Sequence, residues 1–87
     1  MAWVYILRGR SGRHYIGSTI DLIRRIEEHR AGGTHTTSRL GGDLQIVASL
    51  EVATLKEARD LERKLKRMKS PELAIAFLTQ EFLARDC

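Results

Sequence analysis

The sequence predicts an α+β fold: a small three-stranded antiparallel sheet covered by helices, in the order β-β-α-β-α-α. Near the N-terminus, a turn rich in glycine and arginine separates two short runs of apolar, aromatic and β-branched residues, which is typical of a hairpin. The C-terminal half instead repeats leucine and alanine at helical spacing. Residues 1–87 have the length of one small domain, so we expect a single domain.

The hairpin comes first along the chain. Trp3–Leu7 is the first predicted strand, and His14–Gly17 is the antiparallel return strand. Successive side chains of a strand point to opposite faces, so Tyr5 lies on the face opposite Val4 and Ile6. We expect one of the two faces to be buried and Tyr5 to belong to the other. An exposed tyrosine on a strand is often no more than a good β-former, so sheet packing is one explanation for Tyr5.

The middle of the chain predicts a helix and a third strand. Asp21 is a suitable N-cap for a helix over Leu22–Arg30. The predicted apolar stripe of this helix consists of Leu22, Ile23 and Ile26. A polar loop over Thr34–Asp43 follows, and Leu44–Val52 is the third strand.

Two helices complete the predicted fold. Thr54 and Glu57 have the spacing of a capping box, which opens an amphipathic helix that continues to Met68. Pro71 starts a second helix, because proline is tolerated at the first helical position. The side chains expected to dock this last helix on the sheet are Phe77, Leu78 and Phe82.

The charge is unevenly distributed. The net charge is +4, and the segment from Ala53 to Ser70 accounts for all of it, with seven basic and three acidic residues. A basic helix favours a polyanionic partner, which it would bind by neutralising phosphates. A solvated helix face explains the same residues equally well.

Other features bear on the cellular compartment. No apolar run approaches the roughly 20 residues that span a bilayer. No basic segment precedes the first strand, so we expect no signal peptide and no membrane partner. Cys87 is the single cysteine, so we expect neither an internal disulfide nor a disulfide-linked partner. These features favour a cytoplasmic protein.

Three polar residues on the two main helices are candidates for chemistry. Arg25 and His29 are four residues apart and therefore project from the same side of their helix. In isolation, such a pair is more often simply a surface arginine and histidine. Glu62 lies at the edge of the core-facing stripe of the basic helix, where a carboxylate is less usual. An ion pair with Lys66, four residues on, is the alternative explanation for Glu62.

Taken in order, these residues resemble the GIY-YIG endonuclease superfamily, and most of all its short bacterial single-domain branch. The resemblance rests on Val4-Tyr5-Ile6, Tyr15-Ile16-Gly17, Arg25, His29 and Glu62, in that order and at that spacing. It extends from Trp3 to about Met68. The leading glycine of the first half-motif is absent, because Trp3-Val4 precede Tyr5 here.

The resemblance implies a role for each matching side chain. Tyr5 is expected to act as the general base, and Tyr15 to position the water or the phosphate. Arg25 would stabilise the phosphate charge that develops in the transition state. His29 would support a tyrosine or bridge to the phosphate. Glu62 would be the single carboxylate that holds one Mg²⁺ or Mn²⁺, a hard ion that keeps most of its waters.

A second group of residues is expected to position the substrate. Gly17 would let the substrate backbone approach closely, and His35 matches a histidine or basic residue that the family often has after the first helix. Basic side chains of the hairpin turn and of the basic helix would contact phosphates. These are Arg8, Arg10, Arg13, Arg63 and Lys66.

The predicted function is that of a divalent-metal-dependent endonuclease acting on nucleic acid, with DNA as the expected substrate. Members of the superfamily usually carry a separate DNA-binding domain, for which this chain has no room, so we expect little intrinsic sequence specificity. The roles of other members of the superfamily suggest that this protein acts in DNA repair or recombination. The alternative is a non-catalytic nucleic-acid-binding module that retains the nuclease scaffold. A partner-binding adaptor is a third interpretation, but it leaves the basic bias unexplained.

Overall fold

A computed structural model describes residues 1–30 and 44–85 of the chain. Within them, three strands and three helices follow the predicted order β-β-α-β-α-α, so the predicted α+β class is confirmed. The predicted polar loop at 34–43 lies outside the described residues. The elements are β1 (Ala2–Arg8), β2 (His14–Thr19), α1 (Leu22–Arg30), β3 (Gln45–Val52), α3 (Leu55–Arg67) and α4 (Pro71–Arg85).

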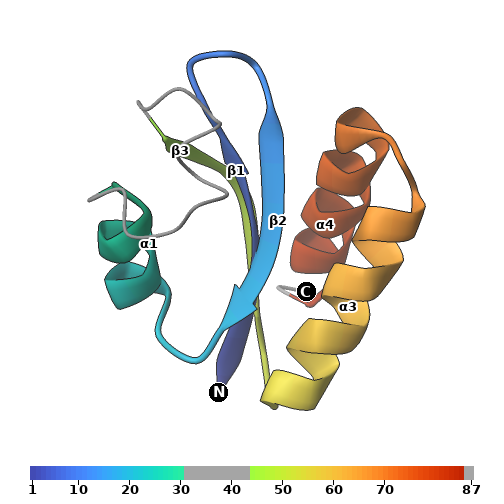
Figure 1. Cartoon of the computed structure of the whole chain (residues 1–87). Coiled ribbons are helices and arrows are strands. Elements are labelled where there is room, and N and C mark those ends of the chain that lie inside the picture. Colours follow the sequence, from blue (N-terminus) through green and yellow to red (C-terminus); the bar gives the residue numbers. More distant parts are fainter. Residues whose placement is uncertain (31–43, 86–87) are drawn as a thin grey trace.

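The sheet lies between two helical layers, as Figure 1 shows. Helix α1 covers one face of the sheet, and α3 and α4 cover the other. The strand order is β2-β1-β3 and both pairings are antiparallel, so β1 is central and β2 is an edge strand. In the β1–β2 register, Tyr5 lies directly opposite Gly17, which brings the two half-motifs side by side.

The central strand β1 is buried on both faces. Val4 and Ile6 belong to the core beneath α3 and α4. Tyr5 and Leu7 point to the opposite face and pack there with Ile26 of α1. The predicted direction of Tyr5 is therefore confirmed, but the expectation of a single buried face is wrong. Because α1 covers the second face, Tyr5 has no exposed surface.

Helix α1 begins at the predicted cap, since the carboxylate of Asp21 accepts a hydrogen bond of 3.1 Å from the backbone N–H of Arg24. Its buried residues are Ile26 and His29, whereas Ile23 is 75% exposed. The predicted apolar stripe was wrong at Ile23. At 3.6 residues per turn, Ile23 points about 120° away from His29, which lies on the buried face.

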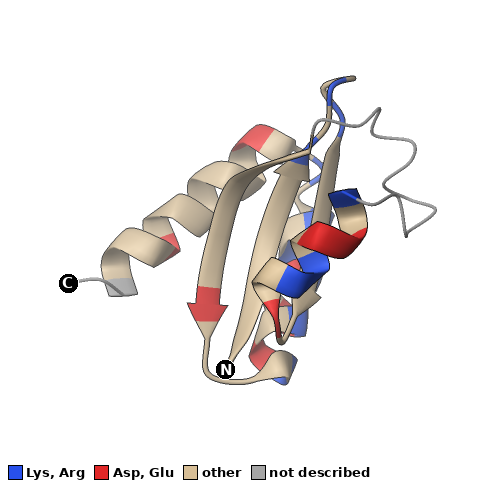
Figure 2. Cartoon of the chain, turned by 90° about the vertical axis from the view of Figure 1, so that its left-hand side faces the viewer, with Lys and Arg blue, Asp and Glu red and all other residues tan. Residues whose placement is uncertain are grey.

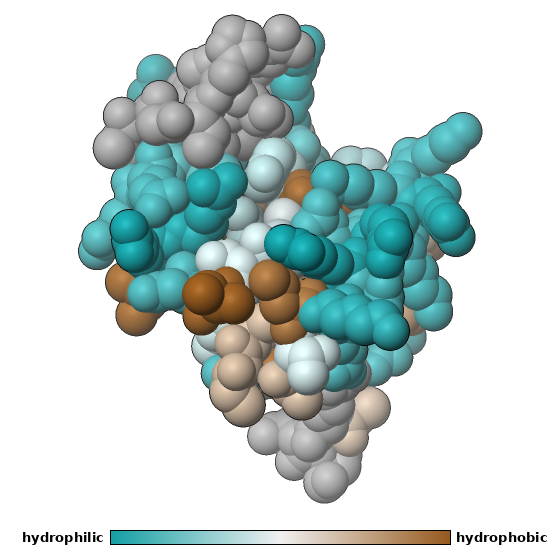
Figure 3. Space-filling model, turned by 60° about the horizontal axis from the view of Figure 1, so that its bottom comes forward, coloured by the Kyte–Doolittle hydropathy of each residue, from teal (hydrophilic) through white to brown (hydrophobic). Residues whose placement is uncertain are grey.

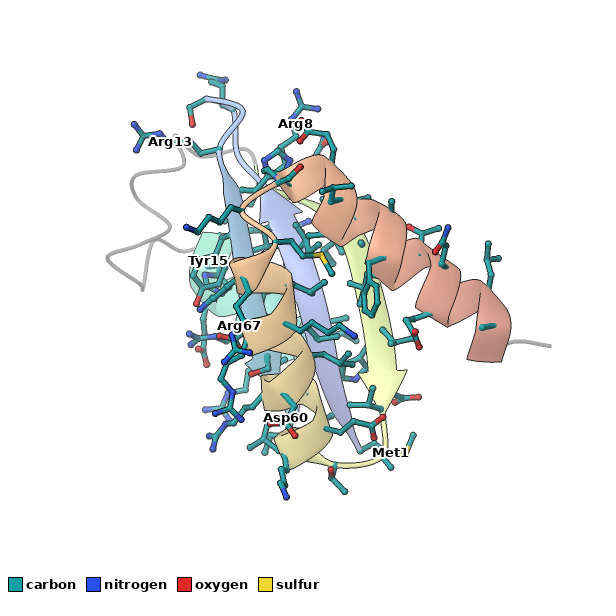
Figure 4. All side chains as sticks on the ribbon, turned by 90° about the vertical axis from the view of Figure 1, so that its right-hand side faces the viewer. Met1, Arg8, Arg13, Tyr15, Asp60 and Arg67 are labelled. Atoms are coloured by element: carbon teal, nitrogen blue, oxygen red, sulfur yellow. The ribbon has the colours of Figure 1, made fainter. Side chains whose placement is uncertain are left out.

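Helices α3 and α4 form the thicker layer. The Thr54 hydroxyl accepts a hydrogen bond of 3.1 Å from the backbone N–H of Glu57, which confirms the cap of α3. Leu78 of α4 is fully buried and Phe77 packs against the same core. The predicted docking of Phe82 was wrong, because this side chain is 50% exposed. Figures 2 and 4 show why: the last turns of α4 run out beyond the edge strand β3. Neither these helices nor α1 is long and apolar enough to cross a membrane.

Candidate active site

The predicted catalytic side chains lie on the α1 side of edge strand β2, and the predicted metal ligand Glu62 lies on its α3 side. Tyr15 packs against the cluster under α1, whereas Ile16 packs against the core under α3 and α4. Ser18, two positions after Ile16, also points toward α3, where it contacts Glu62. Side chains from both sides of the sheet therefore approach one another along the outer edge of β2, where Figure 4 labels Tyr15.

Three aromatic rings form a cluster on the α1 side. The phenol oxygen of Tyr5 lies 3.0 Å from Nε2 of His29 in a buried hydrogen bond. The ring centroid of Tyr15 lies 5.1 Å from that of His29 and 6.3 Å from that of Tyr5. His29 is only 2% exposed, so it is not a solvated surface histidine. Tyr15 is half-buried and is therefore the ring of this cluster with most access to solvent.

Gly17 makes this arrangement possible. A Cβ atom at position 17 would lie 2.6 Å from the phenol oxygen of Tyr5 and 2.9 Å from the ring of Tyr15. Real Cβ atoms do not approach other heavy atoms that closely, so both rings need the space that glycine leaves. Packing within the protein therefore explains why glycine stands at position 17. Its predicted contact with the substrate backbone stays a prediction.

The guanidinium of Arg25 interacts with both phenols. Hydrogen bonding to Tyr5 is the largest of the effects that raise the Arg25 pKa, and bonding to Glu28 and Tyr15 adds to it. The guanidinium also forms an ion pair of 3.0 Å with Glu28, and its side chain is 33% exposed. Arg24 binds the same carboxylate at 3.4 Å. Arg25 is therefore a permanent cation that reaches from the buried phenols toward the solvent.

Burial keeps both Tyr5 and His29 neutral. Burial raises the pKa of Tyr5 from 10.0 to about 12, although the hydrogen bond with Arg25 opposes the rise. Burial also lowers the pKa of His29 below its ordinary value, and the positive charge of Arg25 lowers it further. At neutral pH a protonated phenol therefore faces an uncharged imidazole across a distance of 3.0 Å.

Glu62 binds one partner with each carboxylate oxygen. The Ser18 hydroxyl donates to Oε1 at 2.6 Å, and Nζ of Lys66 donates to Oε2 at 2.8 Å. The ion pair with Lys66, which was the alternative explanation for Glu62, is thus present. It does not bury the carboxylate, because the Glu62 side chain is 21% exposed. Glu62 also contributes to the raised pKa of Tyr5, so the two groups interact electrostatically across the edge of the sheet.

A pair of surface hollows connects the two sides. One hollow, of about 420 Å³, is lined by Arg24, Arg25 and the end of β2. The other, of about 510 Å³, is lined by Glu62 and basic residues of α3. Ser18 and Arg59 line both, so they connect the surroundings of Arg25 with those of Glu62. In Figure 3, hydrophilic surface lies on both sides of an apolar patch at this end of the molecule.

The sequence model of the GIY-YIG catalytic domain matches residues 1–74. The chain belongs to the GIY-YIG family. Membership implies a nuclease-type function, with nucleic acid as the kind of substrate, and nucleases of this family generally depend on a divalent metal.

Similar proteins match most of this chain and about two thirds or more of their own length. A UPF0213 protein of Streptococcus pneumoniae serotype 4 is 32% identical over 85 residues, which are 98% of this chain and 80% of that protein. A UPF0213 protein of Klebsiella pneumoniae is 36% identical over 70 residues, 80% of this chain and 66% of that protein. The solution NMR structure of a UPF0213 protein from Bacillus halodurans has 29% sequence identity and a TM-score of 0.56, and covers 94% of this chain and 87% of that one.

The other predicted positioning residues of this GIY-YIG domain lie in three places. Arg63 lines the hollow beside Glu62 and pairs with Asp60. His35 lies outside the described residues. The arginines of the hairpin turn are exposed, and Figure 4 shows two of them at the far end of the hairpin from the start of α3. At about 3.3 Å per residue, Arg13 is about 13 Å along the strand from Gly17.

Sequence reasoning missed three residues of the site. Ser18 had no assigned role, because its partner Glu62 is 44 residues away. Glu28, which pairs with both Arg24 and Arg25, could have been found from its i,i+3 and i,i+4 spacings. Arg59 precedes Glu62 by three positions on α3, and the same rule places the two side chains on one face.

Proposed function

We propose that residues 1–87 act as one nuclease domain that hydrolyses phosphodiester bonds in DNA with one bound Mg²⁺ or Mn²⁺. The observation that carries this proposal is the junction at β2. Arg25 and the two phenols lie on one side of this strand, Glu62 lies on the other, and hollows that share Ser18 and Arg59 connect them.

The donor set at Glu62 suits a hard divalent ion. The partly exposed carboxylate of Glu62 and the neighbouring Ser18 hydroxyl offer only oxygen donors, which Mg²⁺ and Mn²⁺ prefer. The described residues contain no group of three or more histidine, cysteine or acidic side chains that could enclose a metal. An ion at Glu62 would therefore keep most of its waters. When bound, it would stabilise negative charge on the phosphate and on the leaving oxygen.

Arg25 would bind the scissile phosphate. Its planar guanidinium can form two parallel hydrogen bonds to phosphate oxygens, and it is fully charged at any physiological pH. Arg25 interacts with Tyr5 and its side chain is one-third exposed, so the guanidinium can reach both that phenol and the solvent. We expect phosphate to draw Arg25 away from Tyr5, which gives a water molecule access to the phenol.

Tyr5 would then accept a proton from the attacking water. A neutral phenol cannot keep a second proton, and a pKa of about 12 disfavours loss of its own proton beforehand. Its own proton therefore moves to Nε2 of His29, 3.0 Å away, as the water proton arrives. The lowered pKa of His29 keeps the imidazole uncharged and able to accept. Tyr15, with its half-buried ring, would orient the water or the phosphate.

Basic side chains around the hollows would hold the DNA backbone. Arg59 and Lys56 line the hollow beside Glu62, and Arg24 lines the one beside Arg25. Phosphate contacts fix the position of DNA but carry no base information, so little intrinsic sequence specificity follows. A role in DNA repair or recombination, in the cytoplasm, is the setting that we propose for this activity.

The proposal is tested by nicking of supercoiled plasmid. The purified chain is expected to nick the plasmid with Mg²⁺ or Mn²⁺ and to stop when EDTA is added. Glu62→Ala and Arg25→Ala are expected to abolish nicking while circular dichroism shows an unchanged fold. DNA binding without nicking above the Glu62→Ala background, across metals and substrate shapes, would favour the non-catalytic binding module instead.

A further inference from the structure

The two oxygens of the Glu62 carboxylate lie in different surroundings. Oε1 accepts the Ser18 hydroxyl in a part-buried hydrogen bond. Oε2 accepts the Lys66 ammonium in an exposed one, and the Lys66 side chain is 55% exposed. Of the two bonds, the one with Lys66 is therefore the one that solvent and ions reach.

The ammonium of Lys66 is a cation bound to the oxygen that a metal ion would use. We infer that Lys66 occupies the cation position of Glu62 when no metal is bound, and that a divalent ion must displace it. This inference rests on the proposed metal-dependent function. It assigns Lys66 a second role beyond the predicted phosphate contact, that of a competitor which weakens metal binding.

The competition follows from charge and geometry. A divalent ion on Oε2 would sit where the ammonium lies, and the two positive charges would repel each other at that distance. The ion pair joins positions i and i+4 of α3, so it forms with little rearrangement and breaks as easily. Exposed pairs of this kind contribute little to stability, so the displacement costs little and the metal can still bind.

Another hollow could accept the Lys66 side chain after a metal ion displaces it from Glu62. The same side chain lines a hollow of about 600 Å³ beside Tyr15, together with Lys69 and His14 of β2. This hollow lies along the same edge strand as the two that surround Ser18. A displaced ammonium there would be available to a phosphate, which connects the competitor role to the predicted contact with nucleic acid.

Because Ser18 binds Oε1 of Glu62, Lys66 and a metal ion would compete for Oε2. Its hydroxyl donates to Oε1 at 2.6 Å from a position on β2 that is fixed by the pairing of Ser18 with Val4. The carboxylate is therefore held from the sheet side, and it presents Oε2 to whichever cation is present. An ion that displaces Lys66 meets an oriented ligand.

The inference is tested by titrating Mn²⁺ into the protein without nucleic acid, with free Mn²⁺ followed by electron paramagnetic resonance. Lys66→Met is expected to bind Mn²⁺ about two- to fivefold more tightly than the wild type. Arg67→Met is the matched control, because it removes the same charge from the next position, about 100° around the helix. It is expected to leave the affinity almost unchanged. Lys66→Arg keeps a cation beside Glu62 and is expected to bind no more tightly than the wild type.

A second control shows whether the tighter Mn²⁺ binding of Lys66→Met depends on Glu62. Glu62→Gln in the Lys66→Met background is expected to remove the gain, because the amide carries no charge to hold the ion. The inference is overturned if Lys66→Met binds Mn²⁺ no better than the wild type, or if Arg67→Met gains as much. Thermal melts of all variants check that the fold is intact, as the exposure of Lys66 leads us to expect.

The two proposals fail in different ways. Metal-dependent nicking by the wild type, with Mn²⁺ affinity unaffected by Lys66→Met, overturns the competitor role and leaves the nuclease proposal standing. Mn²⁺ affinity that rises in Lys66→Met, without nicking by any form of the protein, overturns the nuclease proposal and leaves the competition at Glu62 standing.

Discussion

The phenol of Tyr5 on β1 and the imidazole of His29 on α1 share a buried hydrogen bond of 3.0 Å across 24 residues of sequence. The two groups come from elements on either side of the α1–sheet interface, and burial shifts the pKa values of both so that both stay neutral. This pair links the fold to the proposed chemistry, because it helps to hold α1 on the sheet and offers a route for a proton.

The first prediction concerns the strength of this pair. Tyr5→Phe removes the hydroxyl and leaves Nε2 of His29 without that partner, so we expect a loss of about 1–3 kcal/mol of unfolding free energy. His29→Leu is expected to cost a similar amount. The double variant should lose less than the sum, which denaturant unfolding of all four proteins measures. Strict additivity would show that the hydrogen bond contributes nothing.

The second prediction concerns pH. The His29 pKa is lowered in the folded state, so its contribution to stability is present above its ordinary value of 6.5. This contribution is lost as the pH falls through the lowered folded pKa, because the unfolded state then binds a proton that the folded state resists. Thermal melts from pH 7.5 to 5 should show a decrease that is smaller in His29→Leu. An equal decrease in both proteins would contradict the lowered pKa.

The same shift predicts the pH profile of nicking. Protonated His29 cannot accept the Tyr5 proton, so the rate should fall on the acidic side only at pH values below 6.5. Single-turnover rates between pH 5 and 8, at pH values where the melts show a folded protein, measure the profile. A rate that is already halved above pH 6.5 contradicts His29 as the proton acceptor.

The third prediction concerns Gly17. Gly17→Ala places a Cβ 2.6 Å from the phenol oxygen of Tyr5, so one of the rings must shift. We expect a loss of about 1–3 kcal/mol of unfolding free energy. Gly12→Asn is the control for backbone strain alone, since Gly12 has a φ of 85°, a region that asparagine adopts more often than most non-glycine residues, and no atom within 4 Å of its Cβ position. Equal stability of the two variants would contradict the close packing at Gly17.

The fourth prediction separates Arg25 from its neighbour. Arg25→Ala is expected to reduce the nicking rate about 10²–10³-fold, because a charge aimed at the transition-state phosphate is lost. Arg24→Ala removes a more exposed side chain that pairs with the same Glu28, and it should have a much smaller effect. The comparison is made under single-turnover conditions at saturating metal. Equal losses would indicate general charge rather than a specific phosphate contact.

Sequence reasoning predicted most of the fold because its signals are local. The hairpin, the caps of α1 and α3, and the order of elements all follow from residues near one another in the chain. Errors arose where burial depends on another element. Ile23 is exposed because of how α1 sits on the sheet, and Phe82 because α4 runs past β3.

The candidate site was predictable as a set of residue types but not as a geometry. The family resemblance named Tyr5, Arg25 and Glu62, whereas the contact between Ser18 and Glu62 joins elements that are 44 residues apart. The full burial of Tyr5 depends on the second helical layer, which alternation within one strand does not reveal. A local pattern fixes which way a side chain points, but long-range packing decides what it meets there.

The central claim is that Glu62 holds the ion that makes this GIY-YIG domain a nuclease, and Glu62→Gln tests it most directly. The measurement compares plasmid nicking and DNA binding by the wild type and by Glu62→Gln at the same Mg²⁺ or Mn²⁺ concentrations. We predict metal-dependent nicking by the wild type, and loss of nicking with retained DNA binding in the variant. Nicking by Glu62→Gln at the wild-type rate would contradict the account.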